Sequence, residues 1–166
     1  MTTTERENIY ASWLQEHRGI LFKVIRVYAH RQEDREDLFQ EVALQLWRSV
    51  DSFRGDSSLT TWIYRVALNT AMKWKGREEA RQQRVGEPTL IAETDQYENE
   101  QINWLYQQIG KLSKVDRSVI LLLLEGFSYR EIADIIGISE SNTGVKIHRI
   151  KQQLAEAAKS TDHYAI

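Results

Sequence analysis

The sequence predicts an all-α protein made of two small helical domains joined by a flexible linker. Apolar residues recur at helical spacing through most of the 166 residues, and no segment alternates apolar and polar residues for long. Capping residues and glycines divide this pattern into short helices. With 42% hydrophobic residues and a single proline, Pro88, the composition suits packed helical cores rather than a disordered chain.

The composition also excludes several functional classes. There are no cysteines, so disulfides and thiolate metal sites are excluded, and the four histidines lack metal-binding spacing. No glycine-rich phosphate loop is present, and adjacent acids such as Glu36 and Asp37 have no partner base. The first fifteen residues are polar, and the longest apolar run, residues 119–124, cannot span a bilayer. We therefore expect a soluble, cytoplasmic protein without cofactor, metal, catalytic site or membrane insertion.

Charge is distributed unevenly along the chain. Residues 51–86 hold seven Lys/Arg and four Asp/Glu, whereas residues 87–112 hold one and five. The whole chain has a net charge of −2, which argues against a protein that coats nucleic acid by itself. A basic segment followed by an acidic connector indicates parts with separate tasks.

The first domain is expected over residues 1–81 and should contain four helices. Thr4 and Glu7 have the spacing of a capping box, which predicts that the first helix starts near Glu5. A second apolar run follows Gly19 and predicts a second helix there.

A third helix is expected over residues 35–49, with Asp34 as its N-terminal cap. Helical spacing predicts the buried side chains Leu38, Val42, Leu46 and Trp47. It also brings four polar residues to one side, namely Asp37, Gln40, Glu41 and Arg48. Taken alone, such a side is typical of a helix face in contact with water.

A polar loop over residues 51–56 precedes the fourth helix. Gly55 allows a left-handed backbone there, and Ser57 or Ser58 is expected to cap a helix starting at Leu59. The predicted buried stripe contains Leu59, Trp62, Ile63, Val66, Ala67, Ala71 and Trp74.

A second row on the fourth helix steps by four residues and contains Thr61, Arg65, Asn69 and Lys73. Cations and an amide in a line can hold phosphates and read base edges. In the preceding loop, Phe53 lies beside Arg54 without regular apolar neighbours, so we expect a displayed ring that could stack on an unpaired base. A hydrated helix face and a ring folded into the core would give the same pattern, so the spacing leaves both interpretations open.

Residues 82–100 are expected to form an acidic flexible linker, and residues 159–166 a frayed tail. The second domain, residues 101–158, should begin with a short helix ending at Gly110. A second helix, capped by Ser113 and ending at Gly126, should bury residues 122–124.

The end of the second domain has the pattern of a helix-turn-helix motif. Ser128 and Glu131 form a capping box, Gly137 ends that helix, and Ser139 caps a final helix over residues 140–157. The final helix should bury Thr143, Ile147, Ile150 and Leu154. It should expose a face suited to a DNA major groove, comprising Ser141, Asn142, Val145, Lys146, His148, Arg149 and Lys151. A helical hairpin that contacts protein is the alternative.

Three segments, in this order, resemble one family. Residues 37–42 (DLFQEV) with 46–48 (LWR) resemble the core-docking helix of bacterial RNA polymerase sigma factors of the extracytoplasmic-function group. Residues 53–58 (FRGDSS) with 61–65 (TWIYR) and Asn69 resemble their promoter-melting segment. Residues 125–133 (EGFSYREIA), 137–140 (GISE) and 147–149 (IHR) resemble their upstream promoter-binding domain. Gly144 departs from the Lys or Arg usual in relatives, and residues 111–114 lack a common proline.

The resemblance implies a protein that directs core RNA polymerase to promoters and assists promoter melting. It implies docking on a coiled coil of the largest subunit through Asp37, Leu38, Gln40, Glu41 and Arg48. It implies minus-ten contacts by Phe53, Arg54, Ser58, Thr61, Arg65, Asn69 and Lys73. The exposed face of the final helix would bind the minus-thirty-five element. The resemblance further implies sequestration by an anti-sigma factor, and we expect a monomer when the chain is free.

Two other functional classes stay open on the residues alone. A stand-alone helix-turn-helix regulator would explain residues 113–157 but not the loop at residues 53–58. A helical protein-binding adaptor would explain the amphipathic pattern and should ignore DNA.

Overall fold

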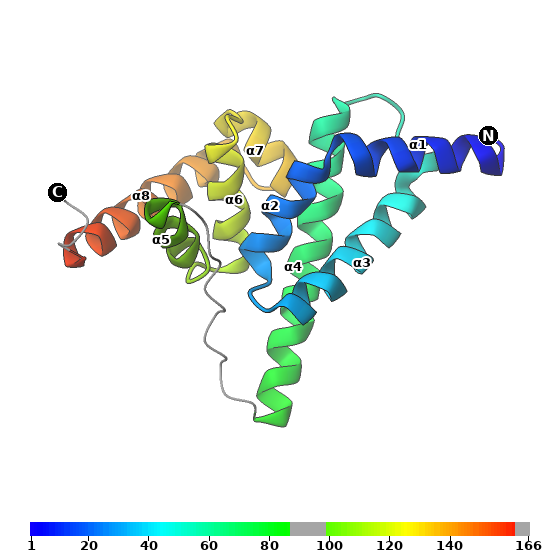
Figure 1. The fold of residues 1–166 in the computed structure, drawn as a ribbon. Helices are drawn as coiled ribbons and strands as arrows, with labels where there is room; N and C mark the ends of the chain where they lie inside the picture. Colours follow the sequence, from blue (N-terminus) through cyan, green and yellow to red (C-terminus); the bar gives the residue numbers. More distant parts are fainter. Residues whose placement is uncertain (87–98, 162–166) are drawn as a thin grey trace. The chain divides into compact units, whose positions relative to one another are not determined.

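The computed structural model describes residues 1–86 and 99–161, and every regular element in these two ranges is helical (Figure 1). The chain divides into two compact units, Met1–Ala92 and Glu93–Ile166. Within the described ranges, no helix has both the length and the apolarity needed to cross a membrane. The predicted all-α fold with two helical domains is confirmed.

Unit 1 is organised around its longest helix. Its helices are α1 (Thr3–Glu16), α2 (Arg18–Tyr28), α3 (Gln32–Ser49), the short 3-10 helix η1 (Val50–Ser52) and α4 (Leu59–Val85). Helices α2 and α3 both pack against α4 and against each other. The side chains between them are fully buried and include Val24, Tyr28, Leu38, Val42, Leu46, Ile63, Ala67 and Leu68. Burial of this apolar area is the main stabilising contribution to the unit.

The first helix begins earlier than the sequence analysis predicted. The Thr2 hydroxyl accepts a hydrogen bond from the Glu5 amide at 3.1 Å, and the Glu5 carboxylate accepts one from the Thr2 amide at 2.8 Å. Both Thr2–Glu5 and Thr4–Glu7 have capping-box spacing, so the choice of Thr4 was wrong.

The starts of α2 and α3 also differ from the prediction. Helix α2 begins at Arg18, which places Gly19 inside its first turn. Helix α3 begins at Gln32, so Asp34 lies in its first turn rather than at the cap. There its carboxylate accepts a hydrogen bond from Arg31 Nε at 3.0 Å. An acid in the first turn of a helix interacts favourably with the helix dipole, just as an acid can cap the helix. The residue type alone therefore did not show whether Asp34 is the cap or lies in the first turn.

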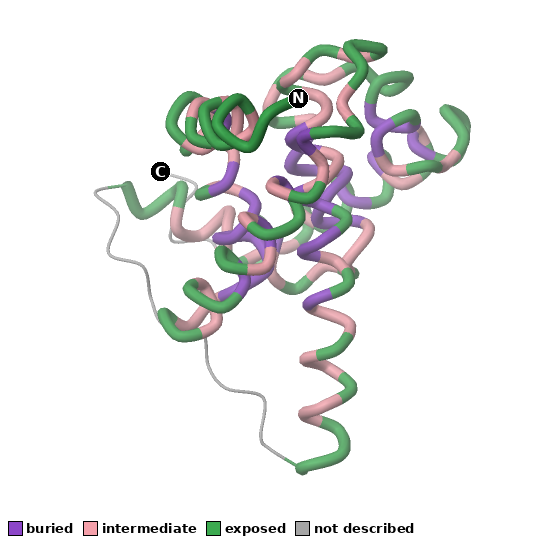
Figure 2. Tube along the Cα trace, turned by 90° about the vertical axis from the view of Figure 1, so that its right-hand side faces the viewer, coloured by how far each residue is buried: buried purple, intermediate pink, exposed green. Residues whose placement is uncertain are grey.

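Helix α4 extends further than expected. Of the two predicted caps, Ser57 and Ser58, it is Ser58 that caps the helix, with its hydroxyl accepting from the Thr61 amide at 3.1 Å. Its buried residues end at Trp74, and later turns are intermediate or exposed (Figure 2). The helix nevertheless continues to Val85 and ends at Gly86, whose φ of 67° is left-handed. Residues 82–85, expected in the linker, are therefore helical, and residues 87–98 lie outside the described ranges.

Unit 2 contains α5 (Glu100–Ile109), α6 (Lys114–Leu124), α7 (Tyr129–Ile136) and α8 (Glu140–Ser160), and α6, α7 and α8 pack against one another. The predicted caps are confirmed, since Ser113, Ser128 and Ser139 each accept a hydrogen bond from the amide three residues later. The turn between α7 and α8 has Gly137 at a φ of 85°.

Two expectations for unit 2 were wrong. Leu124 is 53% exposed and Leu123 half-buried, although both were expected to be buried, because α6 ends at Leu124 and its last residues lie at the edge of the packed core. Helix α8 continues to Ser160, so residues 159–160 of the expected tail are helical. Thr161 follows as the C-cap of α8, and residues 162–166 lie outside the described residues.

Candidate functional site

The residues of α3 that were expected to dock on the polymerase have different environments. Leu38 has no exposed surface, so its expected contact with a partner is wrong: the same stripe that packs α3 against α4 buries it completely. Asp37 accepts a hydrogen bond from Trp74 Nε1 at 2.9 Å. Because Trp74 is itself buried, this bond satisfies an indole donor and joins α3 to α4.

A groove of about 400 Å³ between α3 and α4 brings together residues assigned to separate tasks. Glu41 and Arg48 line it from α3, and Asn69 and Lys73 line it from α4. Arg77, which the sequence analysis did not single out, forms an ion pair with Glu41 across the groove. The groove therefore has a cationic and amide lining with a single carboxylate already paired to an arginine.

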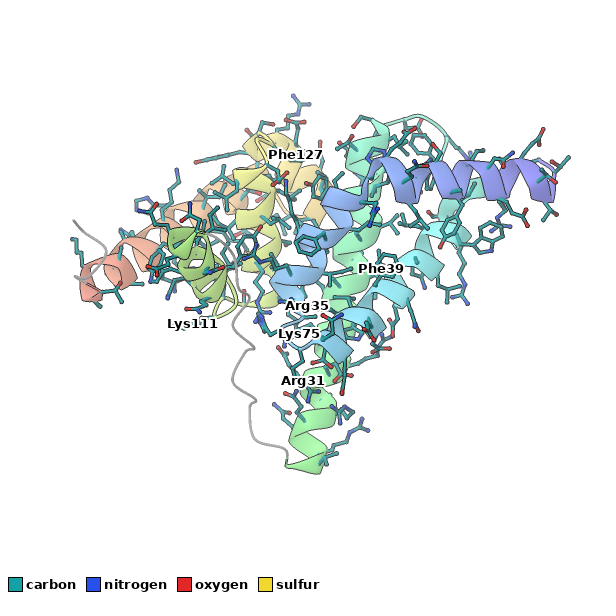
Figure 3. All side chains as sticks on the ribbon, viewed as in Figure 1. Arg31, Arg35, Phe39, Lys75, Lys111 and Phe127 are labelled. Atoms are coloured by element: carbon teal, nitrogen blue, oxygen red, sulfur yellow. The ribbon has the colours of Figure 1, made fainter. Side chains whose placement is uncertain are left out.

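A second groove, of about 1060 Å³, lies among α1, α2 and α3, and Gln40 is on its rim. Two of its lining side chains are large and exposed: Phe22 at 54% and Phe39 at 44%. Figure 3 labels Phe39 on α3. Leu44, also on α3, is 46% exposed. We call Phe22, Phe39, Gln40 and Leu44 the α2–α3 surface. The sequence analysis missed its apolar members, although Phe39 and Leu44 fall outside the buried stripe of α3, which was the available indication.

Phe53 is not displayed, contrary to expectation. Its ring packs edge-on against Trp13 of α1, with centroids 5.9 Å apart. It is tilted against the ring of Trp62 of α4, with centroids 5.5 Å apart. The prediction failed because Trp13 is 40 residues away in sequence and supplies the apolar neighbour that local spacing could not reveal. Phe53 therefore fixes the loop before α4.

Helix α1 holds this region at a second point. Arg6 donates a hydrogen bond to the Trp47 carbonyl at 2.9 Å, and its guanidinium lies 4.5 Å above the Trp47 ring. It also pairs with Asp51 of η1 at 3.2 Å. Tyr10 packs edge-on against Trp47 at 5.3 Å, and burial raises the pKa of its phenol. These contacts join α1 to the end of α3 and the start of the loop.

The polar row on α4 is only partly presented to solvent. Asn69 and Lys73 are exposed, whereas Thr61 and Arg65 are half-buried. Ser58 donates a hydrogen bond to the Thr61 hydroxyl at 3.0 Å, so both residues contribute to the helix start. Arg54 in the loop is exposed.

In unit 2, the predicted reading face of α8 is exposed at Ser141, Asn142, Val145, His148, Arg149 and Lys151. Two of its cations are held by Asp116, a carboxylate of α6 that the sequence analysis did not assign to the site. Arg149 Nη2 lies 3.0 Å from Asp116 Oδ2, and Lys146 Nζ lies 3.5 Å from Asp116 Oδ1. Asp116 is buried, so this ion pair fixes α8 on α6 and orients both cations along one side of the helix.

Replacing Asp116 by Asn should lower the free energy of unfolding of unit 2. The amide keeps the shape but removes the charge that binds two cations, and we expect a loss of about 1–2 kcal/mol. Chemical denaturation followed by circular dichroism measures this, with Glu156→Gln, an exposed change on α8, as control. An unfolding midpoint equal to that of the control would contradict a stabilising role.

The start of α7 is closed by a reciprocal pair of hydrogen bonds. The Ser128 amide donates to Glu131 at 3.0 Å, and the Glu131 amide donates to the Ser128 hydroxyl at 3.1 Å. Hydrogen bonds from the Ser128 backbone and then its side chain hold the pKa of Glu131 below its ordinary value. The stability that this cap contributes is therefore fully present above the pKa that Glu131 has in the unfolded chain. It is lost as the pH falls through the lower pKa of Glu131 in the folded protein.

Comparison with known proteins identifies both units. Residues 13–81 match the family model for Sigma-70 region 2, and residues 102–154 match that for Sigma-70, region 4. The chain belongs to the sigma-70 family. Relatives named as extracytoplasmic-function RNA polymerase sigma factors place it in that group. It is a sigma factor, which directs RNA polymerase to specific promoters.

Individual relatives align along most of this sigma factor. RNA polymerase sigma factor YlaC of Bacillus subtilis is 30% identical over 157 residues, covering 89% of this chain and 88% of its own. The extracytoplasmic-function sigma-E factor of Haemophilus influenzae is 31% identical over 141 residues, covering 74% of each chain. The sigma factor RpoE of Bartonella quintana, solved with the anti-sigma factor NepR, has the same fold. It has a TM-score of 0.71 at 21% identity, covering 93% of this chain and 99% of that one.

The match over residues 13–81 decides between the classes that the residues alone left open. A stand-alone helix-turn-helix regulator and a helical adaptor give no account of that match.

Proposed function

We propose that this sigma factor docks on core RNA polymerase through the α2–α3 surface and contacts promoter DNA through α4 and α8. The observation that supports this most strongly is that Phe22 and Phe39, two large exposed apolar side chains on adjacent helices, line the same groove. Solvent-exposed aromatic groups around a groove are typical anchors of a protein interface. Leu44 adds an exposed aliphatic side chain further along α3. Asn69 and Lys73, the exposed members of the polar row of α4, face the DNA.

In this proposal, the polymerase coiled coil packs on Phe39 and Leu44, and Gln40 supplies a polar contact at the rim. Asp37 is exposed and Glu41 half-buried, so both stay candidate contacts with the polymerase in addition to holding Trp74 and Arg77. Arg48 is exposed and stays a candidate contact with the polymerase or with the DNA.

The minus-ten element passes along α4. Asn69 and Lys73 contact the single strand, with Arg65 and Thr61 beside them and Arg54 and Ser58 at the loop. Phe53 supports the loop from within through its two tryptophan contacts. Extruding a base costs a few kcal/mol of stacking, and contacts held in place by the polymerase offset that cost.

The minus-thirty-five element is bound by α8 in the major groove. Asn142 and Val145 reach base edges, with Ser141 and His148 beside them. Lys146, Arg149 and Lys151 contact phosphates, and Asp116 sets the direction from which the first two approach.

The free sigma factor is a cytoplasmic monomer without catalytic activity, and core polymerase supplies the chemistry. With a net charge of −2, it binds duplex promoter weakly when alone. An anti-sigma factor sequesters it. The Bartonella quintana relative, solved in such a complex, supports this regulation.

Replacing Lys73 by Ala tests the minus-ten assignment. We expect promoter binding by the holoenzyme to weaken, and the slope of log affinity against log salt to fall by about one charge, because one phosphate contact is removed. The probe is a promoter selected by the holoenzyme from randomised DNA, opened at the minus-ten element, and binding is titrated at several salt concentrations.

The matched control is Arg84→Ala, which removes an exposed cation about three turns further along α4. It should leave affinity and salt slope unchanged. Equal effects of the two changes would show a general charge effect and reject the Lys73 contact.

A further inference from the structure

The reading face of α8 contains a hollow next to α7. Its walls are formed by Tyr129, Gly144, Val145 and His148, with Glu140 and Ser141 at the edge, and its volume is about 730 Å³. A Cβ placed on Gly144 would lie 3.8 Å from the Tyr129 ring. The glycine therefore leaves the ring uncovered, and any side chain of lysine size at this position would cover it.

The lining of the hollow is mostly apolar where DNA-reading helices are usually polar. Val145 is 63% exposed and Tyr129 is 40% exposed, and both side chains line the hollow. No lysine or arginine lines it, and Glu140 adds a carboxylate at its edge. This lining disfavours a phosphate, because the anion would meet a carboxylate and an aromatic ring, with only the His148 imidazole and the Ser141 hydroxyl as side-chain donors beside the Tyr129 phenol.

We propose that this hollow receives the 5-methyl group of a thymine in the upstream promoter element, with Val145 and Tyr129 contacting the methyl. In the major groove, this methyl is the apolar group that base edges present to a protein, and apolar side chains are its usual contacts. This inference rests on the proposed function, because it requires α8 to enter the major groove. It assigns specificity at one base pair to a glycine and its two apolar neighbours.

The test uses the holoenzyme assembled from core RNA polymerase and the full chain. An upstream element is first selected from randomised duplex DNA. Each thymine is then replaced by uracil, which lacks only the methyl. At one position the replacement should weaken binding about fourfold, the factor for removing one methyl from apolar contact.

Two variants locate the effect. Val145→Ser removes one wall, and Gly144→Leu fills the hollow, so each should bring the thymine-to-uracil ratio close to one. Both positions lie on the surface of α8, and circular dichroism checks that the variants fold. Gln153→Ala, exposed and two turns further along the helix, should keep the wild-type ratio.

The outcomes separate the two proposals. If selection returns no preferred upstream element, the assignment of α8 to promoter DNA fails, and this inference fails with it. If an element is selected but uracil is equivalent to thymine at every position, only this inference is overturned. The same holds if the fourfold ratio persists in both Val145→Ser and Gly144→Leu.

Discussion

Replacing Phe39 by Asp should strongly weaken assembly of this sigma factor with core RNA polymerase while leaving its fold intact. Phe39 is 44% exposed, so the acid would not be forced into the core of unit 1. On the proposed interface it would place an unpaired charge in an apolar contact. Loss of a central anchor of this kind typically costs 2 kcal/mol or more, which is about thirtyfold or more in affinity.

The measurement is the dissociation constant for core polymerase, using the full-length chain. Val85→Asp is the matched control, because Val85 is also an exposed apolar residue of unit 1 but lies at the far end of α4. Leu44→Asp should behave like Phe39→Asp. If Phe39→Asp binds core polymerase as tightly as Val85→Asp, the α2–α3 surface is not the docking site.

Variants at Asp37 and Glu41 would not give a clean test of polymerase docking. Charge reversal at Asp37 and Glu41 would remove the partner of Trp74 Nε1 and the partner of Arg77. Loss of polymerase binding in that double variant would mix destabilisation of the α3–α4 packing with loss of docking. Exposed positions on the α2–α3 surface avoid this ambiguity.

Replacing Trp13 by Ala should strongly lower the free energy of unfolding of unit 1. Trp13 is 5% exposed and packs against Phe53. Removing a buried tryptophan side chain typically costs about 3–5 kcal/mol. Because α1 contacts the loop through this ring, we also expect promoter opening to decrease more than polymerase binding.

Urea denaturation of the full chain measures the first effect. Tryptophan fluorescence reports mainly on unit 1, since Trp13, Trp47, Trp62 and Trp74 lie there and only Trp104 lies in unit 2. Trp13→Phe keeps most of the apolar volume and should lose clearly less stability. An unchanged midpoint for Trp13→Ala would contradict the role assigned to this contact.

Local sequence information was sufficient wherever a structural feature depends on neighbouring residues. Ser113, Ser128 and Ser139 each satisfy an amide three residues later, so their caps could be predicted from the sequence. Local sequence information was insufficient where two nearby residues could both cap the same helix. Thr2 and Thr4 both offer capping-box spacing, and nothing within a few residues decides between them. The extension of α4 to Val85 was missed for a related reason, because its last turns bury no apolar stripe.

The candidate site depended more on contacts distant in sequence. Phe53 is covered by Trp13, and Asp116 binds Arg149, 33 residues away. Neither contact can be predicted from the helical spacing of residues in the sequence. Leu38 shows a different limitation, because a residue in a family motif was carried over as a contact although its own spacing placed it in the core. The exposed residues of the polar row on α4, by contrast, lie where helical spacing predicted.

Transcription in vitro tests the central claim most directly. Core RNA polymerase is mixed with promoter-containing genomic DNA, with and without the chain, and the 5′ ends of the transcripts are mapped. We predict new start sites that depend on the chain and share two spaced upstream elements, and their loss with Phe39→Asp but not with Val85→Asp. Transcripts that are the same with and without the chain would contradict the account.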